Sequence, residues 1–388
     1  MYLLPKPKTI KEQDGQMLLC HSTHIVMTKE VAETEMHAAK RLQEAIRQET
    51  GLILPFSVGE VREGDLSLGI AKTLPEQTYE ITIDEKGGQI SGGDGAGVLY
   101  GVETFCQIVQ QCGGILPCVQ IQDAPDMPNR GYYFDQTRGR VLKLEELKKI
   151  ADRMCRYKLN QLQLYVEHTY LFRDFSEMWR DQTPLTAEEI RELDSYCRER
   201  HIELVPSLAS FGHLCTLLST KTYGDLCEME DSWKEPFSFW NRMRYHTINV
   251  SDERSLPLIK KMIAEYMQLF SSNKFNICAD ETFCLGKYKS KKLAEERGVH
   301  RLYIDYVKEL AQFLVENGKI PMFWGDIIWN SPELMKELPE SMICLNWGYA
   351  PEQREDETRA IAQTGAVQYL CPGVCGWNQW ANLIENSY

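Results

Sequence analysis

The residues best able to do chemistry are two adjacent carboxylates, Asp280 and Glu281, which follow the mostly apolar run 275–279. Neighbouring side chains inside a strand point to opposite faces, but a turn at the strand end can bring both to one site. Two close carboxylates push their pKa values apart, so one can keep a proton near neutral pH and act as a general acid. A solvated loop or an acidic helix start is the alternative explanation of this pair.

Further polar and aromatic side chains follow other apolar runs, at the ends of the strands that we expect. They are Arg138, Glu167, His168, His213, Trp324, Asp326, Trp347, Tyr349 and Trp377. Indole rings stack on the apolar face of a pyranose and charged groups hold its hydroxyls, so this set is typical of a sugar site. His213 follows a glycine, which favours a site role, whereas a structural role is equally compatible with His168.

Other kinds of chemistry have weaker support in the sequence. The histidines show no His-x-x-x-His or His-x-x-Glu-His spacing, so we expect no metal site. Cys278 and Cys215 have apolar neighbours, which argues against a thiolate nucleophile. The glycine-rich segment 92–97 lacks the lysine of a phosphate-binding loop and is expected to be a turn. We therefore expect no cofactor.

All of these side chains lie after residue 130, where short apolar runs alternate with amphipathic helices. The expected strands are 131–135, 161–165, 202–207, 275–280, 320–326, 342–347 and 366–370. This alternation indicates a parallel sheet, and the residue count favours a (β/α)8-type (TIM) barrel over an open Rossmann sheet. A capping box from Thr186 to Glu189 predicts the start of one of its helices.

The first part of the chain reads as a small α+β domain. Its expected strands are 17–20, 24–27, 66–70, 79–84, 89–91 and 119–123, with helices over 28–50 and from Gly97. Pro125 and Pro128 mark its end. The expected domains are therefore 1–125, a small α+β domain, and 126–388, the barrel.

The barrel is expected to be incomplete at its eighth strand. The long segment 210–245 uses the residues that another strand would need, and 378–388 is typical of the first turns of a helix without a C-cap. We expect a chain that is truncated at its C-terminus, or an open barrel that a partner closes.

Composition limits the partners and the compartment. The net charge is −13, whereas nucleic acids and anionic membranes bind basic surfaces, so neither partner is expected. The 13 irregularly spaced cysteines are typical of reduced thiols, and the N-terminus shows no secretory signal. The sequence therefore predicts a cytoplasmic protein, and it leaves a homodimer open.

Several segments, taken in this order, resemble the family 20 glycoside hydrolases, the β-N-acetylhexosaminidases. Segments 97–105 and 121–125 resemble the end of that family's small non-catalytic domain. Arg130 to Arg138 is similar to its first barrel strand, and 157–160 to the entry of the second. The run 275–281 resembles the family hallmark that ends in Asp-Glu.

The resemblance implies a retaining exo-β-N-acetylhexosaminidase that removes terminal N-acetylglucosamine or N-acetylgalactosamine from an oligosaccharide or glycoconjugate. The substrate's own acetamido oxygen would attack the anomeric carbon and form an oxazolinium intermediate. Asp280 would orient the acetamido nitrogen, and Glu281 would act as acid and then as base. Arg138 would hold the O3 and O4 hydroxyls. Trp324, Trp347 and Trp377 would wall the pocket, and Tyr349 would hydrogen-bond the sugar.

Three departures from the family pattern leave the chemistry of the Asp280–Glu281 pair unaffected. Glu167-His168-Thr169 stands where the family has a His and a paired Asp. The segment Ser207 to His213 lacks the family's acidic residues, and Ala279 replaces a glycine. These changes put the substrate range and the pH optimum in doubt. The alternatives are a sugar-binding pseudoenzyme or inactive fragment, and a related barrel glycosidase acting on a sugar without an acetamido group.

Overall fold

The computed structural model describes residues 1–350, 352 and 354–373. They form two compact units. The first comprises 1–132, 144–162 and 193–203, and the second comprises 133–143, 163–192 and the described residues from 204 onward. Each unit is described by itself.

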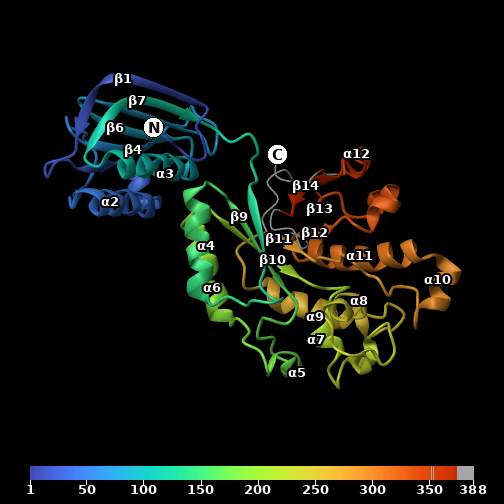
Figure 1. Ribbon diagram of the computed structural model, residues 1–388. Coiled ribbons are helices and arrows are strands. Elements are labelled where there is room, and N and C mark those ends of the chain that lie inside the picture. The colour runs from blue at the N-terminus through green and yellow to red at the C-terminus, as the bar shows by residue number, and fades with distance from the viewer. Residues whose placement is uncertain (351, 353, 374–388) are drawn as a thin grey trace. The chain divides into compact units, whose positions relative to one another are not determined.

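The first unit is built on a seven-stranded mixed sheet in the order β1-β7-β5-β6-β4-β2-β3. Its strands are β1 (Thr9–Leu18), β2 (Ile25–Met27), β3 (Phe56–Val58), β4 (Leu66–Ile70), β5 (Tyr79–Asp84), β6 (Gly87–Gly92) and β7 (Ile115–Asp123). The neighbouring pairs β1–β7, β7–β5 and β5–β6 are antiparallel. The pairs β6–β4, β4–β2 and β2–β3 are parallel. Helices α2 (Met36–Thr50) and α3 (Gly95–Cys112) cover one face of the sheet (Figure 1). Their apolar sides bury Leu42, Ile46 and Phe105 completely.

The segment expected as one helix over 28–50 is two helices, α1 (Lys29–Thr34) and α2. Thr28 caps α1 as its sequence position predicts, and its side chain accepts a hydrogen bond from the Val31 N–H. Glu35 leaves helical geometry, with φ −120° and ψ 26°. Its carboxylate is 2.8 Å from Nε2 of His201, so this buried contact accompanies the break. Gly51 ends α2 in the left-handed conformation, as expected.

The second sheet contains the strands of a barrel fold in chain order, β8-β9-β10-β11-β12-β13-β14. They are β8 (Gly131–Asp135), β9 (Gln161–Val166), β10 (Glu203–Leu208), β11 (Lys274–Asn276), β12 (Ile320–Trp324), β13 (Ile343–Gly348) and β14 (Val367–Pro372). The pairs from β10 to β14 are parallel. The expected fold class, a (β/α) barrel incomplete at the eighth strand after a small α+β domain, is confirmed for the described residues.

Helices alternate with these strands along the chain. They are α4 (Leu144–Arg156), α5 (Ser176–Trp179), α6 (Ala187–Arg198), α7 (Cys215–Leu218), α8 (Phe239–Arg244), α9 (Ser255–Met267), α10 (Lys291–Arg297), α11 (Val299–Glu316) and α12 (Glu355–Ala362), with 3-10 turns at Gly224–Leu226, Ser232–Lys234, Ile328–Asn330 and Pro332–Glu337. The capping box at the start of α6 is confirmed. Thr186 Oγ1 accepts from the Glu189 N–H at 3.2 Å, and the Glu189 carboxylate accepts from the Thr186 N–H at 2.9 Å.

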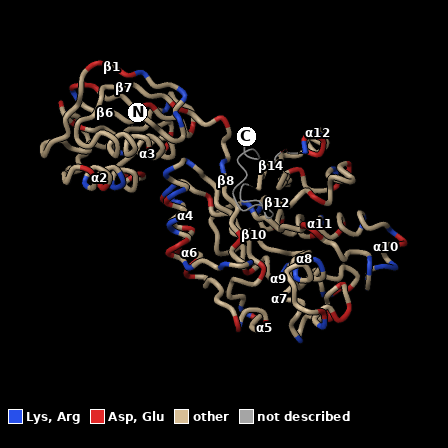
Figure 2. Tube along the Cα trace, viewed as in Figure 1, with Lys and Arg blue, Asp and Glu red and all other residues tan. Residues whose placement is uncertain are grey.

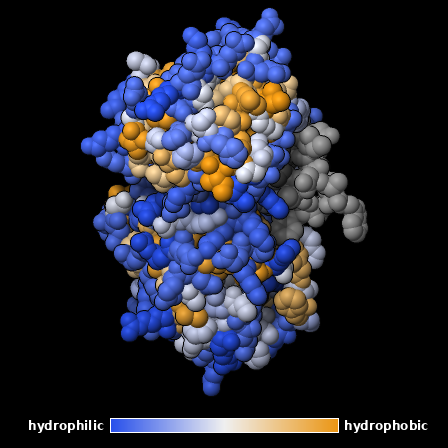
Figure 3. Space-filling view, turned by 90° about the vertical axis from the view of Figure 1, so that its left-hand side faces the viewer, coloured by the Kyte–Doolittle hydropathy of each residue, from blue (hydrophilic) through white to orange (hydrophobic). Residues whose placement is uncertain are grey.

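Acidic and basic residues are interspersed along helices such as α2 (Figure 2). One face, drawn in Figure 3, is mostly hydrophilic, and its apolar side chains gather in separate small patches. Among the described residues, no helix is both long enough and apolar enough to span a bilayer.

Candidate active site

The Asp280–Glu281 pair lies on an unusual turn just after β11. We expected a strand over 275–280, but β11 ends at Asn276. The chain leaves the extended conformation because Cys278 and Ala279 have positive φ angles of 58° and 64°. Asn276 supports the start of this turn, since its Oδ1 accepts the Cys278 N–H at 2.8 Å. The turn, not continued strand alternation, therefore sets where the two carboxylates point.

Side chains from neighbouring elements hold this turn in place. The Ser210 hydroxyl donates to the Ile277 carbonyl at 2.5 Å, and the Tyr303 hydroxyl donates to the Ala279 carbonyl at 3.1 Å. Gly212 lies so close that a Cβ there would be 2.6 Å from the Asp280 carbonyl oxygen. The segment after β10 and the turn after β11 can therefore pack together only with a glycine at position 212.

The His213 imidazole lies beside both carboxylates. Its Nε2 is 3.2 Å from Glu281 Oε2 and 3.4 Å from Asp280 Oδ2. The ring is buried, whereas 19% of the Asp280 side chain and 26% of the Glu281 side chain remain exposed. His213 and Glu281 also have positive φ angles, of 59° and 49°. Such strain in non-glycine residues gathers at functional sites, and here it is concentrated around one carboxylate pair.

Electrostatics favour the charged forms of His213 and Asp280 at neutral pH. Burial alone would lower the pKa of His213, but Asp280 and then Glu281 outweigh it and raise the value to about 10. Burial alone would raise the pKa of Asp280, but His213 and Arg138 outweigh it and hold the value below its usual range. The imidazole is therefore protonated and Asp280 is ionised at neutral pH.

The same trio is the cluster of possible metal ligands in the described residues, with one ligand atom from each side chain lying within 4.8 Å of the others. A metal would need the imidazole in its neutral form. With its pKa raised to about 10, the His213 imidazole is instead the cation that contacts both carboxylates in this structure.

Asp326, just after β12, holds the backbone of the carboxylate pair. Its Oδ2 accepts the Glu281 N–H at 3.0 Å. Its other oxygen is buried and has no hydrogen-bond partner in the part of the chain that the structure describes. Burial, followed by the negative charge of Asp280, raises the pKa of Asp326 to about 8. The side chain is therefore neutral at neutral pH and contacts the backbone of the site.

Arg138 and Glu167 belong to a second charged network in the same unit. Arg138 Nε is 2.6 Å from Asp135 Oδ2 and 3.9 Å from Glu167 Oε1. Glu167 accepts from the Tyr165 hydroxyl at 2.9 Å and from Arg242 at 3.0 Å. Arg138 lies over the Tyr165 ring and is close enough to Asp280 to lower its pKa.

The His168 imidazole contacts Thr216 and Glu167. Its Nδ1 is 3.2 Å from the Thr216 hydroxyl and 3.9 Å from Glu167 Oε2. The ring is buried, and burial lowers its pKa. These contacts fit the structural role, one of the two roles that the sequence allows for His168.

Two groups of aromatic rings contain the tryptophans singled out in the sequence. Trp324 meets the Tyr133 ring edge-on at 4.9 Å between centroids. Trp347 lies 5.2 Å from the ring of Tyr349, which is 43% exposed, and 6.3 Å from Trp329. Among the described residues, the buried Trp347 indole N–H has no hydrogen-bond acceptor. Trp377 lies outside the described residues.

The sequence did not single out Arg242 or Tyr133. Arg242 sits on α8, within the segment 210–245, for which no element was expected. Tyr133 lies on β8, and its hydroxyl is 3.1 Å from that of Ser207. Two arginines in the aromatic-rich stretch 239–245 are the one signal that could have indicated Arg242.

Comparison with known proteins gives consistent matches. A family model described as glycosyl hydrolase family 20, domain 2, matches residues 1–124, and the catalytic-domain model of that family matches 128–377. A β-hexosaminidase of Porphyromonas gingivalis is 24% identical over 96% of this chain and 50% of its own length. The chain spans about half the length of the first curated relatives that it matches.

Solved structures share the fold. A β-N-acetylhexosaminidase from Bacteroides fragilis superposes with a TM-score of 0.78 and 18% sequence identity. The match covers all of this chain and 79% of the Bacteroides chain. A mutant β-hexosaminidase of Streptomyces plicatus, in complex with its product GlcNAc, superposes on this chain with a TM-score of 0.79 and 19% sequence identity. The match covers 96% of this chain and 74% of the Streptomyces chain.

Proposed function

The chain belongs to glycosyl hydrolase family 20, and from that premise we propose that it is a retaining exo-β-N-acetylhexosaminidase. Its substrate would be a terminal β-linked N-acetylglucosamine or N-acetylgalactosamine on an oligosaccharide or glycoconjugate. The observation that carries the proposal is the adjacent Asp280–Glu281 pair just after β11, with the buried His213 imidazole 3.4 Å and 3.2 Å from the two carboxylates.

The spacing of the carboxylates supports retention. Oxygens of Asp280 and Glu281 lie within 4.8 Å of each other. An inverting glycosidase needs about 6.5–9.5 Å between its carboxyl groups, to leave room for the attacking water. A pair this close leaves no room for that water and so supports retention, in which water enters only in the second step. Membership of family 20, not the spacing, supports the substrate's acetamido oxygen as the first nucleophile.

The charge states fit distinct roles for the pair. Asp280 is ionised, which suits a group that orients the acetamido N–H and stabilises the positive charge of an oxazolinium ion. Glu281 would protonate the leaving oxygen and later take a proton from water. His213, 3.2 Å from Glu281, would hold that carboxylate in position.

The surrounding groups supply sugar contacts in this proposal. Arg138, anchored by Asp135, would bind the O3 and O4 hydroxyls, because a guanidinium presents several donors in a fixed plane. Trp324 and Trp347 would form apolar walls, and Tyr349 would reach the acetamido group or a hydroxyl.

The test is hydrolysis of 4-nitrophenyl N-acetyl-β-glucosaminide and of the matching glucoside. We expect turnover of the N-acetyl substrate alone, and a fall of about 100-fold or more in kcat for Glu281→Gln, since a positioned acid contributes about 10²–10⁴-fold. Glu295→Gln, on the surface of α10, is the matched control and should behave like the wild type.

Three other outcomes would overturn the proposal. Full activity of Glu281→Gln would refute the assignment of the acid. Preferred turnover of the glucoside would favour a glycosidase that needs no acetamido group. Binding of N-acetylglucosamine in calorimetry without turnover would indicate a sugar-binding pseudoenzyme.

A further inference from the structure

Two arginines of the second unit lie close to one buried carboxylate, Glu167. Arg242 of α8 donates from Nη2 to Glu167 Oε2 at 3.0 Å, and Arg138 Nε is 3.9 Å from the other oxygen, Oε1. Only 3% of the Glu167 side chain is exposed. A carboxylate buried this deeply needs a cation and hydrogen-bond donors, so Glu167 attracts whichever arginine can reach it.

The closer partner of Arg138 is Asp135, not Glu167. The Arg138 Nε donates to Asp135 Oδ2 at 2.6 Å. Asp135 Oδ1 accepts the backbone N–H groups of Thr137 and Arg138, both at 2.9 Å, so the turn after β8 fixes this carboxylate. In this position the guanidinium lies over the Tyr165 ring, 4.7 Å from its centroid. Asp135 therefore places the side chain that we expect to hold the sugar.

Helix α8 supplies the cation that Glu167 takes instead. Arg242 reaches the carboxylate, and the next residue, Met243, has its Sδ atom 3.2 Å from Arg138 Nη1. The Nε atom of Arg242 is buried and has no hydrogen-bond partner in the part of the chain that the structure describes. An unsatisfied buried donor is unfavourable. The favourable part of this placement is therefore the positive charge that α8 brings to Glu167.

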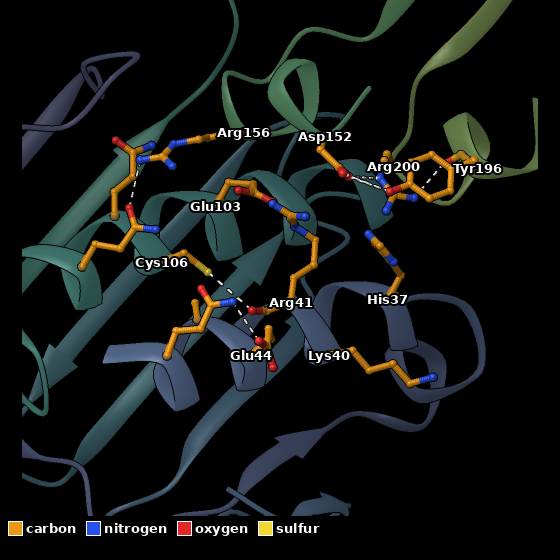
Figure 4. Close-up of a pocket in the computed structure, with 14 residues that line it drawn as sticks. His37, Lys40, Arg41, Glu44, Glu103, Cys106, Asp152, Arg156, Tyr196 and Arg200 are labelled. Carbon is orange, nitrogen blue, oxygen red and sulfur yellow. Dashed lines mark hydrogen bonds and ion pairs between the residues drawn. The ribbon is translucent and has the colours of Figure 1, made fainter. Parts of the chain in front are cut away.

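A buried carboxylate of the first unit is matched in the same way. Glu103 of α3 is buried and pairs with Arg41 of α2 (Figure 4). One arginine from another helix thus compensates a buried carboxylate in this protein. In the second unit Arg242 does so for Glu167, and the charge of Arg138 is not needed there.

We propose that Arg242 is a positioning residue for sugar binding, because it neutralises Glu167 and so keeps Arg138 in place. His168, 3.9 Å from Glu167, does not supply this charge, since burial lowers its pKa. Without the Arg242 guanidinium, Arg138 would turn from Asp135 to the uncompensated Glu167. The inference rests on the proposed function in one respect, the role of Arg138 at the O3 and O4 hydroxyls.

A crystal structure of Arg242→Gln tests the inference without any sugar. We expect the Arg138 guanidinium to leave Asp135 and to form hydrogen bonds of about 2.7–2.9 Å with Glu167. Arg244→Gln makes the same substitution at an exposed position of α8 and is the matched control, in which Arg138 should stay on Asp135. An Arg138 side chain that stays on Asp135 in Arg242→Gln would overturn the inference, whatever sugar the protein binds.

Kinetics on 4-nitrophenyl N-acetyl-β-glucosaminide test the consequence for binding. We expect Arg242→Gln to raise KM about tenfold with kcat within about threefold of the wild type, because a hydrogen bond to the sugar is lost in the ground state and the transition state alike. In the double variant Glu167→Gln/Arg242→Gln no anion attracts Arg138, so KM should return toward the wild-type value. A loss of packing alone would not be reversed by a second substitution. An unchanged KM in Arg242→Gln, or a double variant no better than the single one, would overturn the inference.

Arg242→Lys covers the case in which Arg242→Gln does not fold, since removing one partner of a buried ion pair is strongly destabilising. Lysine keeps the positive charge, and the contact with Glu167 is made by one guanidinium nitrogen, so we expect KM within about threefold of the wild type. A shift of Arg138 to Glu167 in Arg242→Lys would contradict the role of the charge. A wild type that turns over no N-acetyl substrate would overturn the proposed function, and the crystal structures would still decide this inference.

Discussion

At the scale of single residues, the carboxylate pair depends on buried groups that never need to touch a sugar. His213 supplies a positive charge to both carboxylates, and Asp326 holds the Glu281 N–H. The raised pKa of Asp326, about 8, means that its oxygens stay neutral beside the ionised Asp280. Asp326 is thus a positioning residue whose ionisation would add a second negative charge to the site.

Asp326→Asn tests this role through pH. A carboxyl whose pKa is raised in the folded state contributes stability that is present below its ordinary value and lost as pH rises through the folded value. Wild type should therefore lose stability between pH 4 and pH 8 through this group. We expect the free energy of unfolding, measured with urea, to fall between pH 5 and pH 8 by about 2–4 kcal/mol more in the wild type than in Asp326→Asn.

The activity profile supplies the contrary outcome. We expect kcat of the wild type to fall as pH rises through about 8, and Asp326→Asn to move that fall to higher pH. A high-pH limb at the same position in both proteins would contradict the role of Asp326.

At the scale of elements, the site is made by two close turns, after β10 and after β11. Positive φ angles at Cys278, Ala279 and Glu281 redirect the chain, and His213 on the other turn has one too. Gly212 permits the contact between the turns. The strain is supported by hydrogen bonds from Ser210 and Tyr303.

Gly212→Ala tests this packing. Its Cβ would meet the Asp280 carbonyl oxygen at 2.6 Å, so the backbone carrying the pair must shift. We expect kcat/KM to fall by about 100-fold, because misplacing reacting groups by ~1 Å has that effect, and stability to fall by about 1–3 kcal/mol. Gly69→Ala, whose Cβ would be 3.4 Å from the Thr28 Cγ2 atom, is the matched control. Undiminished activity of Gly212→Ala would show that the contact does not position the pair.

The sequence predicts the elements well where local chemistry decides them. The α6 capping box and the Gly51 stop depend on neighbours in the chain, and both are confirmed. Tertiary contacts decide what the sequence misses. The break at Glu35 accompanies a contact with the distant His201, and the turn at 277–279 is held by Ser210 and Tyr303. Arg242 reaches Glu167 from a short helix that has no periodic apolar pattern.

At the scale of the whole molecule, two units carry separate features. The carboxylate pair lies in the second unit, and the mixed α+β sheet lies in the first. The family models divide the chain at about the same place as Pro125 and Pro128, although α4 and part of α6 cluster with the first unit. A sugar bound at the carboxylate pair should therefore slow amide exchange mainly in the second unit.

Hydrogen exchange with a thiazoline mimic of the oxazolinium ion tests this separation. We expect slower amide exchange in peptides covering 208–214 and 277–284, and little change over 1–124, because ligand binding stabilises the elements that it contacts. Asp280→Asn should weaken the protection. Protection confined to 1–124 would contradict the location of the sugar site.

The most direct test of substrate assistance is the turnover of aryl β-glucosaminides whose acetamido group carries zero, one, two or three fluorine atoms. Fluorine withdraws electrons and weakens the amide oxygen as a nucleophile, while the leaving group stays the same. We expect kcat to fall stepwise with each added fluorine. A kcat that is independent of fluorination, or the absence of turnover with every substrate of the series, would contradict the proposed mechanism.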